Sequence, residues 1–169
     1  RSSTTPPAAR TNTTMPLGQS PGNRFGQGKY LPAIAMAHEI PYVATATVAE
    51  LHDLEAKVRR AMEIRGARYI HILVPCPLGW GHDPSETIKI ARLAKETGLF
   101  PVLEAEGSKL TQVSKIKRKL PVEDYLRPQQ RYAHLFKDPV RRDVIDKIQQ
   151  MADRNILRYR LLDDVERRA

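Results

Sequence analysis

The sequence predicts an α/β fold built around a mainly parallel sheet flanked by helices. Two apolar, β-branched runs, Pro41–Thr47 and Arg68–Val74, have the composition of strands that are buried on both faces. An amphipathic segment of helical length separates them. Strand, helix and strand at these lengths form a βαβ unit, so the two strands should be parallel and joined by a right-handed crossover.

The helix between the two strands, Val48–Arg65, is predicted from the spacing of its apolar residues. They recur every three or four positions with charges between them, and they are Val48, Leu51, Leu54, Val58, Ala61 and Met62. Gly66 follows and should end the helix. Before the first strand, residues 31–40 are predicted to contain a short helix with Pro32 in its first turn, where a missing N–H costs nothing.

A third helix is predicted to begin after Asp83. This residue can cap the helix, Pro84 suits its first position, and Glu86 is placed to complete a capping box. The buried face should consist of Ile88, Ile90, Ala91, Leu93 and Ala94. Gly98 should end the helix.

The remainder of the chain is predicted to be a hairpin followed by helices. Residues 99–116 should form two strands that turn at Gly107–Ser108. From Pro121 onward the pattern is helical, and Asp138 is predicted to cap a long polar helix. We expect this tail to be too polar for the core and to form an arm that lies on a neighbouring domain or subunit.

Composition and charge narrow the class of protein. The chain has 169 residues, 41% of them hydrophobic, which is enough for a real core, and no apolar stretch is long enough to span a bilayer. A single cysteine is typical of a reducing cytoplasm. The net charge of +9 suits an acidic partner. A basic, non-enzymatic module that binds nucleic acid is therefore an alternative to an enzyme, although the sequence contains no nucleic-acid-binding motif.

Cys76 is the only cysteine, so it cannot form an internal disulfide. It directly follows the second predicted strand, and ligands of open α/β sheets bind just outside the carboxyl ends of the strands. The thiol could be a buried packing residue, a nucleophile or a metal ligand. His71 and His82 are close in sequence, but their spacing is not that of a persuasive zinc site. His38 and His71 lie inside apolar elements and are predicted to be packing residues.

The first thirty residues consist largely of Thr, Pro, Gly and Ser. On composition this stretch is predicted to be disordered, with an active-site loop as the alternative.

Three stretches of the chain resemble a known family. They are "RSSTTPPAARTNTTMPLG", the long block that includes "AHEIPYVATAT" and "YIHILVPCPLGWG", and "LPVEDYLRPQQRYAHL". Together they resemble the C-terminal half of the β subunit of 2-oxoacid:ferredoxin oxidoreductases, the pyruvate synthase group. The likeness extends from Arg1 to about Phe136.

This resemblance implies a cytoplasmic, CoA-dependent enzyme that oxidatively decarboxylates a 2-oxoacid, with pyruvate expected. Such enzymes use thiamine diphosphate with Mg²⁺, and 4Fe–4S clusters carry their electrons to ferredoxin. By resemblance, four cysteines hold one cluster, Cys76 is the last of them, and the other three lie in the first half of the subunit. Pro77, Leu78 and Trp80 would exclude water from this cluster, although Trp80 could equally be a core aromatic residue.

The sequence also departs from the family, because it lacks the Gly-Asp-Gly and Asn-Thr-Gly elements that serve the diphosphate. The resemblance therefore implies half a subunit, which depends on the missing N-terminal half and on other subunits. Residues 1–30 would be a cofactor-proximal loop, 31–106 the C-terminal part of the thiamine-diphosphate-binding α/β domain, and 107–169 the hairpin remainder with a helical C-terminal arm. Neither a membrane nor nucleic acid is an expected partner.

Overall fold

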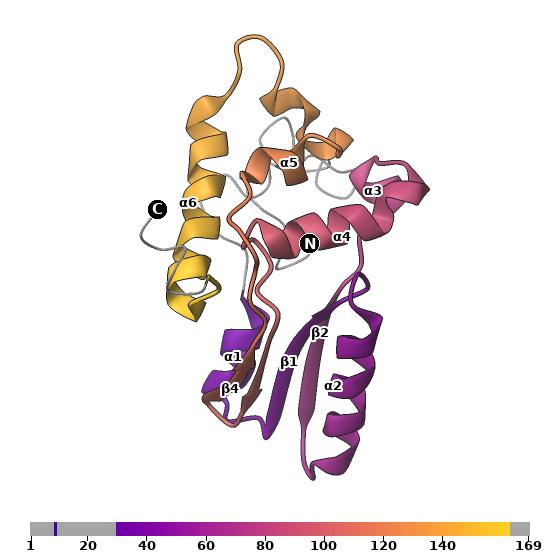
Figure 1. Ribbon diagram of the computed structural model, residues 1–169, viewed down its shortest axis with the longest axis vertical. Coiled ribbons are helices and arrows are strands. Elements are labelled where there is room, and N and C mark those ends of the chain that lie inside the picture. The colour runs from indigo at the N-terminus through magenta and orange to yellow at the C-terminus, as the bar shows by residue number, and fades with distance from the viewer. Residues whose placement is uncertain (1–8, 10–29, 163–169) are drawn as a thin grey trace.

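The computed structural model describes residue 9 and residues 30–162, so the predicted cofactor-proximal loop lies almost entirely outside the described residues. Figure 1 shows a sheet with two flanking helices at one end of the molecule and a group of helices at the other. In chain order the elements are α1 (Leu31–Ala37), β1 (Tyr42–Thr47), α2 (Leu51–Glu63), β2 (Arg68–Leu73), α3 (Pro77–Trp80), the 3₁₀ turn η2 (Pro84–Glu86), α4 (Thr87–Glu96), β3 (Leu103–Glu106), β4 (Lys109–Val113), α5 (Val122–Leu126), the 3₁₀ segment η3 (Gln130–Leu135) and α6 (Arg142–Tyr159).

The sheet has the strand order β2-β1-β3-β4. β1 and β2 are parallel, in a register that pairs Tyr42 with Arg68 and Thr47 with Leu73, which confirms the predicted βαβ unit. β3 pairs antiparallel with both β1 and β4, and the predicted hairpin is confirmed. The α/β class is therefore confirmed, with the parallel pair at one side of the sheet and the antiparallel hairpin at the other.

Helices cover both faces of β1. Its alternate residues point to opposite faces, as in any strand. Tyr42 and Ala44 pack with Ala61 of α2, whereas Val43 packs with Ala35 of α1. All six residues of β1 are buried, as the continuous apolar run predicts.

The helical end of the molecule surrounds the main core. Its largest fully buried side chains include Ile90 of α4, Leu126 of α5, Tyr132 and Leu135 of η3, and Ile148 of α6. The predicted helix after Pro121 is divided at Pro128, because proline lacks the N–H donor that would continue the helix and its ring clashes with the carbonyl four residues earlier. No helix within residues 30–162 has the length and apolar character to cross a membrane.

The predicted start of the third helix is confirmed in part. The carboxylate of Asp83 accepts a hydrogen bond from the backbone N–H of Ser85 at 2.8 Å, and Pro84 follows it at the first position. The capped turn is 3₁₀ and α4 continues from it. Glu86 does not complete a capping box, because its carboxylate pairs with Lys89 at 2.7 Å.

Two predictions about the C-terminal helix are wrong. Asp138 does not cap it: the N–H of Arg141 donates to the carbonyl of Leu135, so the chain turns back first and α6 begins at Arg142. The helix is also not too polar for the core. Its apolar residues recur on one face, and Ile145, Ile148, Ala152, Ile156 and Tyr159 are buried against the rest of this chain.

Candidate functional site

Cys76 lies where the sequence places it, just past the carboxyl end of β2. Its side chain is exposed, so Cys76 is not a packing residue of the core that the described residues form. The residue precedes the single turn of α3, and its carbonyl accepts a hydrogen bond from the N–H of Trp80 at 2.9 Å. Pro77 starts this turn and Gly81, at φ 67°, ends it in the left-handed region that suits glycine. We refer to residues 76–81 as the cysteine turn.

Exposed apolar side chains lie on both sides of Cys76 in the sequence. Leu78, within the cysteine turn, is 93% exposed, and Ile72 and Val74 of the preceding strand region are exposed as well. These three residues form the apolar rim. Exposed apolar residues this close together in the sequence suit a surface that contacts another molecule.

The back of the cysteine turn is fixed against η3. The N–H of Gln130 donates to the carbonyl of Gly81 at 2.9 Å. A Cβ on Gly81 would lie 2.6 Å from the Cβ of Gln130, so only glycine permits this approach. The turn is therefore held on one side by the helical core and is open on the other.

Trp80 joins the cysteine turn to the main core. Its ring is half-buried and packs against that core, which supports the interpretation of a core aromatic residue. The guanidinium carbon of Arg131 lies 3.7 Å from the centre of the Trp80 ring. Nothing in the local pattern "PQQRYAHL" indicates that Arg131 contacts the cysteine turn, so this residue could not be predicted from the sequence.

Arg131 is buried among neutral hydrogen-bonding groups. Its Nε donates to Oε1 of Gln129 at 2.8 Å, and its Nη2 donates to the hydroxyl of Tyr125 at 2.9 Å. Gln129 in turn donates to the carbonyl of Tyr125. Burial raises the pKa of the Tyr125 hydroxyl, and the positive charge of Arg131 opposes part of that rise.

The histidines play different structural roles. His71 fits the prediction of a packing residue: it is half-buried, its Nδ1 is 2.8 Å from the hydroxyl of Tyr69, and burial lowers its pKa. His38 is exposed, so the same prediction is wrong for it. His82 follows the cysteine turn, and its Nδ1 contacts the carbonyl of Asp83 at 2.9 Å.

The described residues do not bring together a complete metal site. Among residues 30–162 no three His, Cys, Asp or Glu side chains are grouped so that they could hold a metal ion, and a zinc site of His71, Cys76 and His82 does not form. One exposed thiol on a rigid turn can supply one ligand to a metal cluster whose other ligands come from elsewhere.

No protein-family model matches the chain. Individual curated proteins do. The pyruvate synthase subunit PorB of Methanosarcina barkeri is 47% identical over 161 residues, which are 95% of this chain and 54% of that protein. The subunit of the same name from Thermotoga maritima is 33% identical over 98% of this chain and 51% of its own length. The ketoisovalerate oxidoreductase subunit VorB of Pyrococcus abyssi is 37% identical over 83% of this chain and 45% of its own length.

The chain spans about half the length of these relatives. The pyruvate synthase subunits match it from both archaeal and bacterial sources, over nearly its whole length. The resemblance stated from the sequence is therefore confirmed: over most of its length, this chain is related to the C-terminal half of the PorB subunits of the pyruvate synthase group.

Proposed function

We propose that this chain is half of the β subunit of a CoA-dependent 2-oxoacid:ferredoxin oxidoreductase, and that Cys76 is one ligand of a 4Fe–4S cluster in it. The observation that carries the proposal is the exposed thiol of Cys76 at the carboxyl end of β2. A buried thiol would need a large rearrangement to reach iron, whereas this one is presented on a turn that is already fixed from behind.

The surroundings of Cys76 suit an iron–sulfur group. Apolar side chains that cover a cluster give it a low-dielectric environment with little water. Leu78 and Val74 are exposed and stand on either side of the thiol in sequence, where they would contact such a group or the polypeptide that supplies its other ligands. With a single cysteine, this chain supplies one thiolate, and the remaining three come from the part of the subunit that it does not span.

The proposed reaction is the oxidative decarboxylation of pyruvate with transfer of the acyl group to coenzyme A. Pyruvate is favoured because most of the relatives are pyruvate synthase subunits, and ketoisovalerate is the alternative that the VorB relative suggests. Thiamine diphosphate, held with Mg²⁺ outside this chain, would activate the 2-oxo carbon. The contribution of the described residues is to hold the Cys76 thiolate and to exclude water around it.

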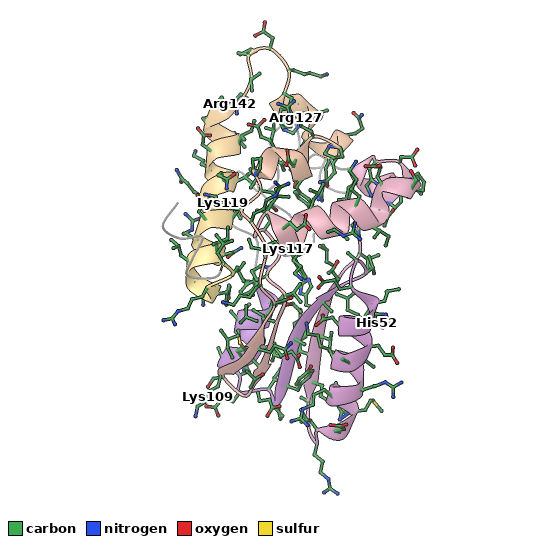
Figure 2. The ribbon with its side chains drawn as sticks, viewed as in Figure 1. His52, Lys109, Lys117, Lys119, Arg127 and Arg142 are labelled. Atoms are coloured by element: carbon green, nitrogen blue, oxygen red, sulfur yellow. The ribbon has the colours of Figure 1, made fainter. Side chains whose placement is uncertain are left out.

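The proposed partners are the other half of the subunit, further subunits of the complex, and ferredoxin in the cytoplasm. The net charge of +9 favours an acidic electron carrier over a basic one. Figure 2 labels several of the cations, among them Lys119, which pairs with Asp153 of α6, and Arg127 and Arg142 at the helical end. The similarity to enzyme subunits favours this proposal over a nucleic-acid-binding module.

The experiment is Cys76→Ser in the assembled enzyme. A serine oxygen is a poor replacement for a soft thiolate, so the variant should lose cluster iron and visible absorbance, and electron transfer to the acceptor should slow by at least about tenfold. Because the Cys76 side chain is exposed in this chain, the chain itself should still fold, while loss of the cluster should lower the unfolding temperature of the assembled enzyme. Iron and sulfide analysis, absorbance and thermal unfolding measure these effects.

Leu78→Ala is the matched control, because it truncates an exposed side chain of the same turn and leaves the thiol in place. This variant should retain full iron content. A Cys76→Ser enzyme with wild-type iron, absorbance and turnover would refute the proposed role of Cys76.

A further inference from the structure

Arg131 is a buried cation that has no anionic partner in the described part of the chain. It is 2% exposed, and the groups that accept its hydrogen bonds, the Gln129 amide and the Tyr125 hydroxyl, are neutral. None of the ion pairs among residues 30–162 involves it. Burying an arginine charge is costly, and proteins normally compensate for it with a carboxylate or another anion.

A second arginine shows what an ordinary surface arrangement looks like in the same region. Arg127 also lies over an aromatic ring, 4.3 Å from the centre of Phe136, but it forms an ion pair with Glu123 at 2.9 Å and its side chain is 57% exposed. Arg131 differs from Arg127 in two respects. Its guanidinium lies over a second ring, 4.9 Å from the centre of Tyr132, and it has no carboxylate partner among the described residues. The rings favour burial of its side chain, but they do not neutralise its charge.

The guanidinium of Arg131 contacts the cysteine turn through Trp80. Its guanidinium lies on the ring of Trp80, and the N–H of Trp80 binds the carbonyl of Cys76. The backbone bond between Gln130 and Gly81 fixes the other end of the same turn. From Cys76 to Trp80 the chain makes one helical turn, which advances about 5.4 Å along its axis. The cation is thus separated from the thiol by one aromatic ring and one turn.

We propose that Arg131 is the counter-charge and positioning residue of the group that Cys76 binds. This inference rests on the proposed function, in which that group is a 4Fe–4S cluster held by thiolates and therefore anionic. Arg131 would do two things: its guanidinium fixes Trp80 and with it the cysteine turn, and its charge stabilises the cluster in its more negative, reduced state. Net charge, hydrogen bonds to the sulfurs and exposure to solvent are the means by which proteins set the potential of such clusters.

The test compares charge-removing and charge-keeping variants in the assembled enzyme. Arg131→Met removes the charge at similar volume, and Arg131→Lys keeps the charge while it loses the planar stack on Trp80. The clusters are titrated with dithionite and followed by EPR, and the signal that disappears in Cys76→Ser identifies the cluster concerned. At a fixed applied potential, Arg131→Met should lower the ratio of reduced to oxidised cluster at least about tenfold. For a one-electron couple this corresponds to a midpoint potential that is lower by about 59 mV.

The control variants separate charge from structure. Arg131→Lys should change that ratio by less than about threefold, while its EPR line shape broadens because the turn is held less firmly. Arg127→Met removes a stacked but exposed and paired arginine, and should leave both potential and line shape unchanged. If Arg131→Met does not accumulate, Arg131→Gln provides the neutral variant, since it keeps a hydrogen-bonding head without the charge.

The possible failures are distinguishable. If the EPR signals are all intact in Cys76→Ser, the proposed function is wrong. If Cys76→Ser loses a signal but the neutral variants of Arg131 keep that cluster at its wild-type potential, the proposed function stands and the inference about Arg131 is overturned. An equal shift of the cluster potential in the neutral variants and in Arg131→Lys would also overturn the inference about Arg131, because the potential would then not depend on the charge at this position.

Discussion

The two edges of the sheet differ in chemistry. At one edge, β4 exposes Lys109, Thr111 and Gln112 to solvent, and the register of the β3–β4 pair shifts at Glu104–Ala105. At the other edge, β2 exposes Ile72, and Val74 directly after it is also exposed. Polar residues and irregular pairing are the usual protection of an edge strand against unwanted association. β4 has both features, although it also exposes Leu110, whereas β2 pairs regularly with β1 and has Arg68 as its one exposed charged residue, so β2 is the less protected edge.

This difference indicates which side of the sheet faces another polypeptide. β4 is suited to solvent, whereas β2 has the composition of a strand that is covered in the assembled protein. The cysteine turn emerges at the end of β2, and Figure 1 shows α2 beside the same strand. The proposed metal ligand therefore lies at the less protected edge, where cysteines from another part of the subunit can reach it.

The largest expected effect is on assembly. Ile72→Lys places a charge on the β2 surface, so association with the remainder of the subunit should weaken by at least about a hundredfold, because a buried unpaired charge costs several kcal/mol. Co-purification of the two halves and size-exclusion chromatography measure the association.

Leu110→Lys on β4 is a matched control, since Leu110 is 44% exposed and Ile72 is 42% exposed. We expect this variant to assemble normally. Equal loss of assembly in both variants would remove the distinction between the edges.

The second-largest expected effect is on the free energy of unfolding, through contacts at the centre of the sheet between the two edges. The hydroxyl of Thr45 donates to the carbonyl of Pro101 at 2.7 Å and accepts from the N–H of Leu103 at 2.9 Å. Thr45→Val should lower the free energy of unfolding by about 1–3 kcal/mol, because it leaves two buried backbone groups without partners. Urea unfolding measures the change.

The same substitution at the polar edge provides the comparison. Thr111 is exposed on β4, so Thr111→Val should change stability by no more than about 0.5 kcal/mol. Similar losses in both variants would show that the Thr45 bonds do not stabilise the join between β1 and β3.

The smallest expected effect is a pH dependence of stability that arises from His71 in β2. Burial lowers the pKa of His71 below 6.5, so protonation favours the unfolded chain, which binds the proton more tightly. The free energy of unfolding should therefore decrease as the pH falls from 6.5 towards the lower pKa of the folded state. His71→Gln should remove this contribution to the slope of the unfolding free energy against pH, as measured by urea titrations at several pH values. An unchanged slope would contradict a lowered pKa for His71.

Local patterns in the sequence predict most of the secondary structure. The apolar run of β1 and the helical spacing of α2 indicate both elements, although α2 extends over Leu51–Glu63 rather than Val48–Arg65. Asp83 and Pro84 likewise indicate where a helical turn begins. These predictions succeed because each depends on residues that are close along the chain, such as a cap and the N–H two residues later.

Predictions that depended on distant contacts were less successful. α6 is polar in composition, yet one face is buried, because α4, α5 and η3 provide a surface that its few apolar residues fit. The exposure of Cys76 depends on where β2 ends relative to the sheet, and free cysteine is more often buried. Arg131 and Trp80 are 51 positions apart in the printed sequence, so no local pattern could pair them.

The sequence by itself determined the α/β class, the parallel β1–β2 pair, the position of Cys76 at a strand end and the relationship to the pyruvate synthase subunits. These follow from periodicity, turn chemistry and motif, which are local properties of the chain. Only the tertiary structure decided that the thiol is exposed, that β2 is the less protected edge, and that an arginine buried without a carboxylate partner among residues 30–162 lies against the cysteine turn. Burial and charge compensation depend on which distant segments meet, and that is fixed only when the whole chain packs.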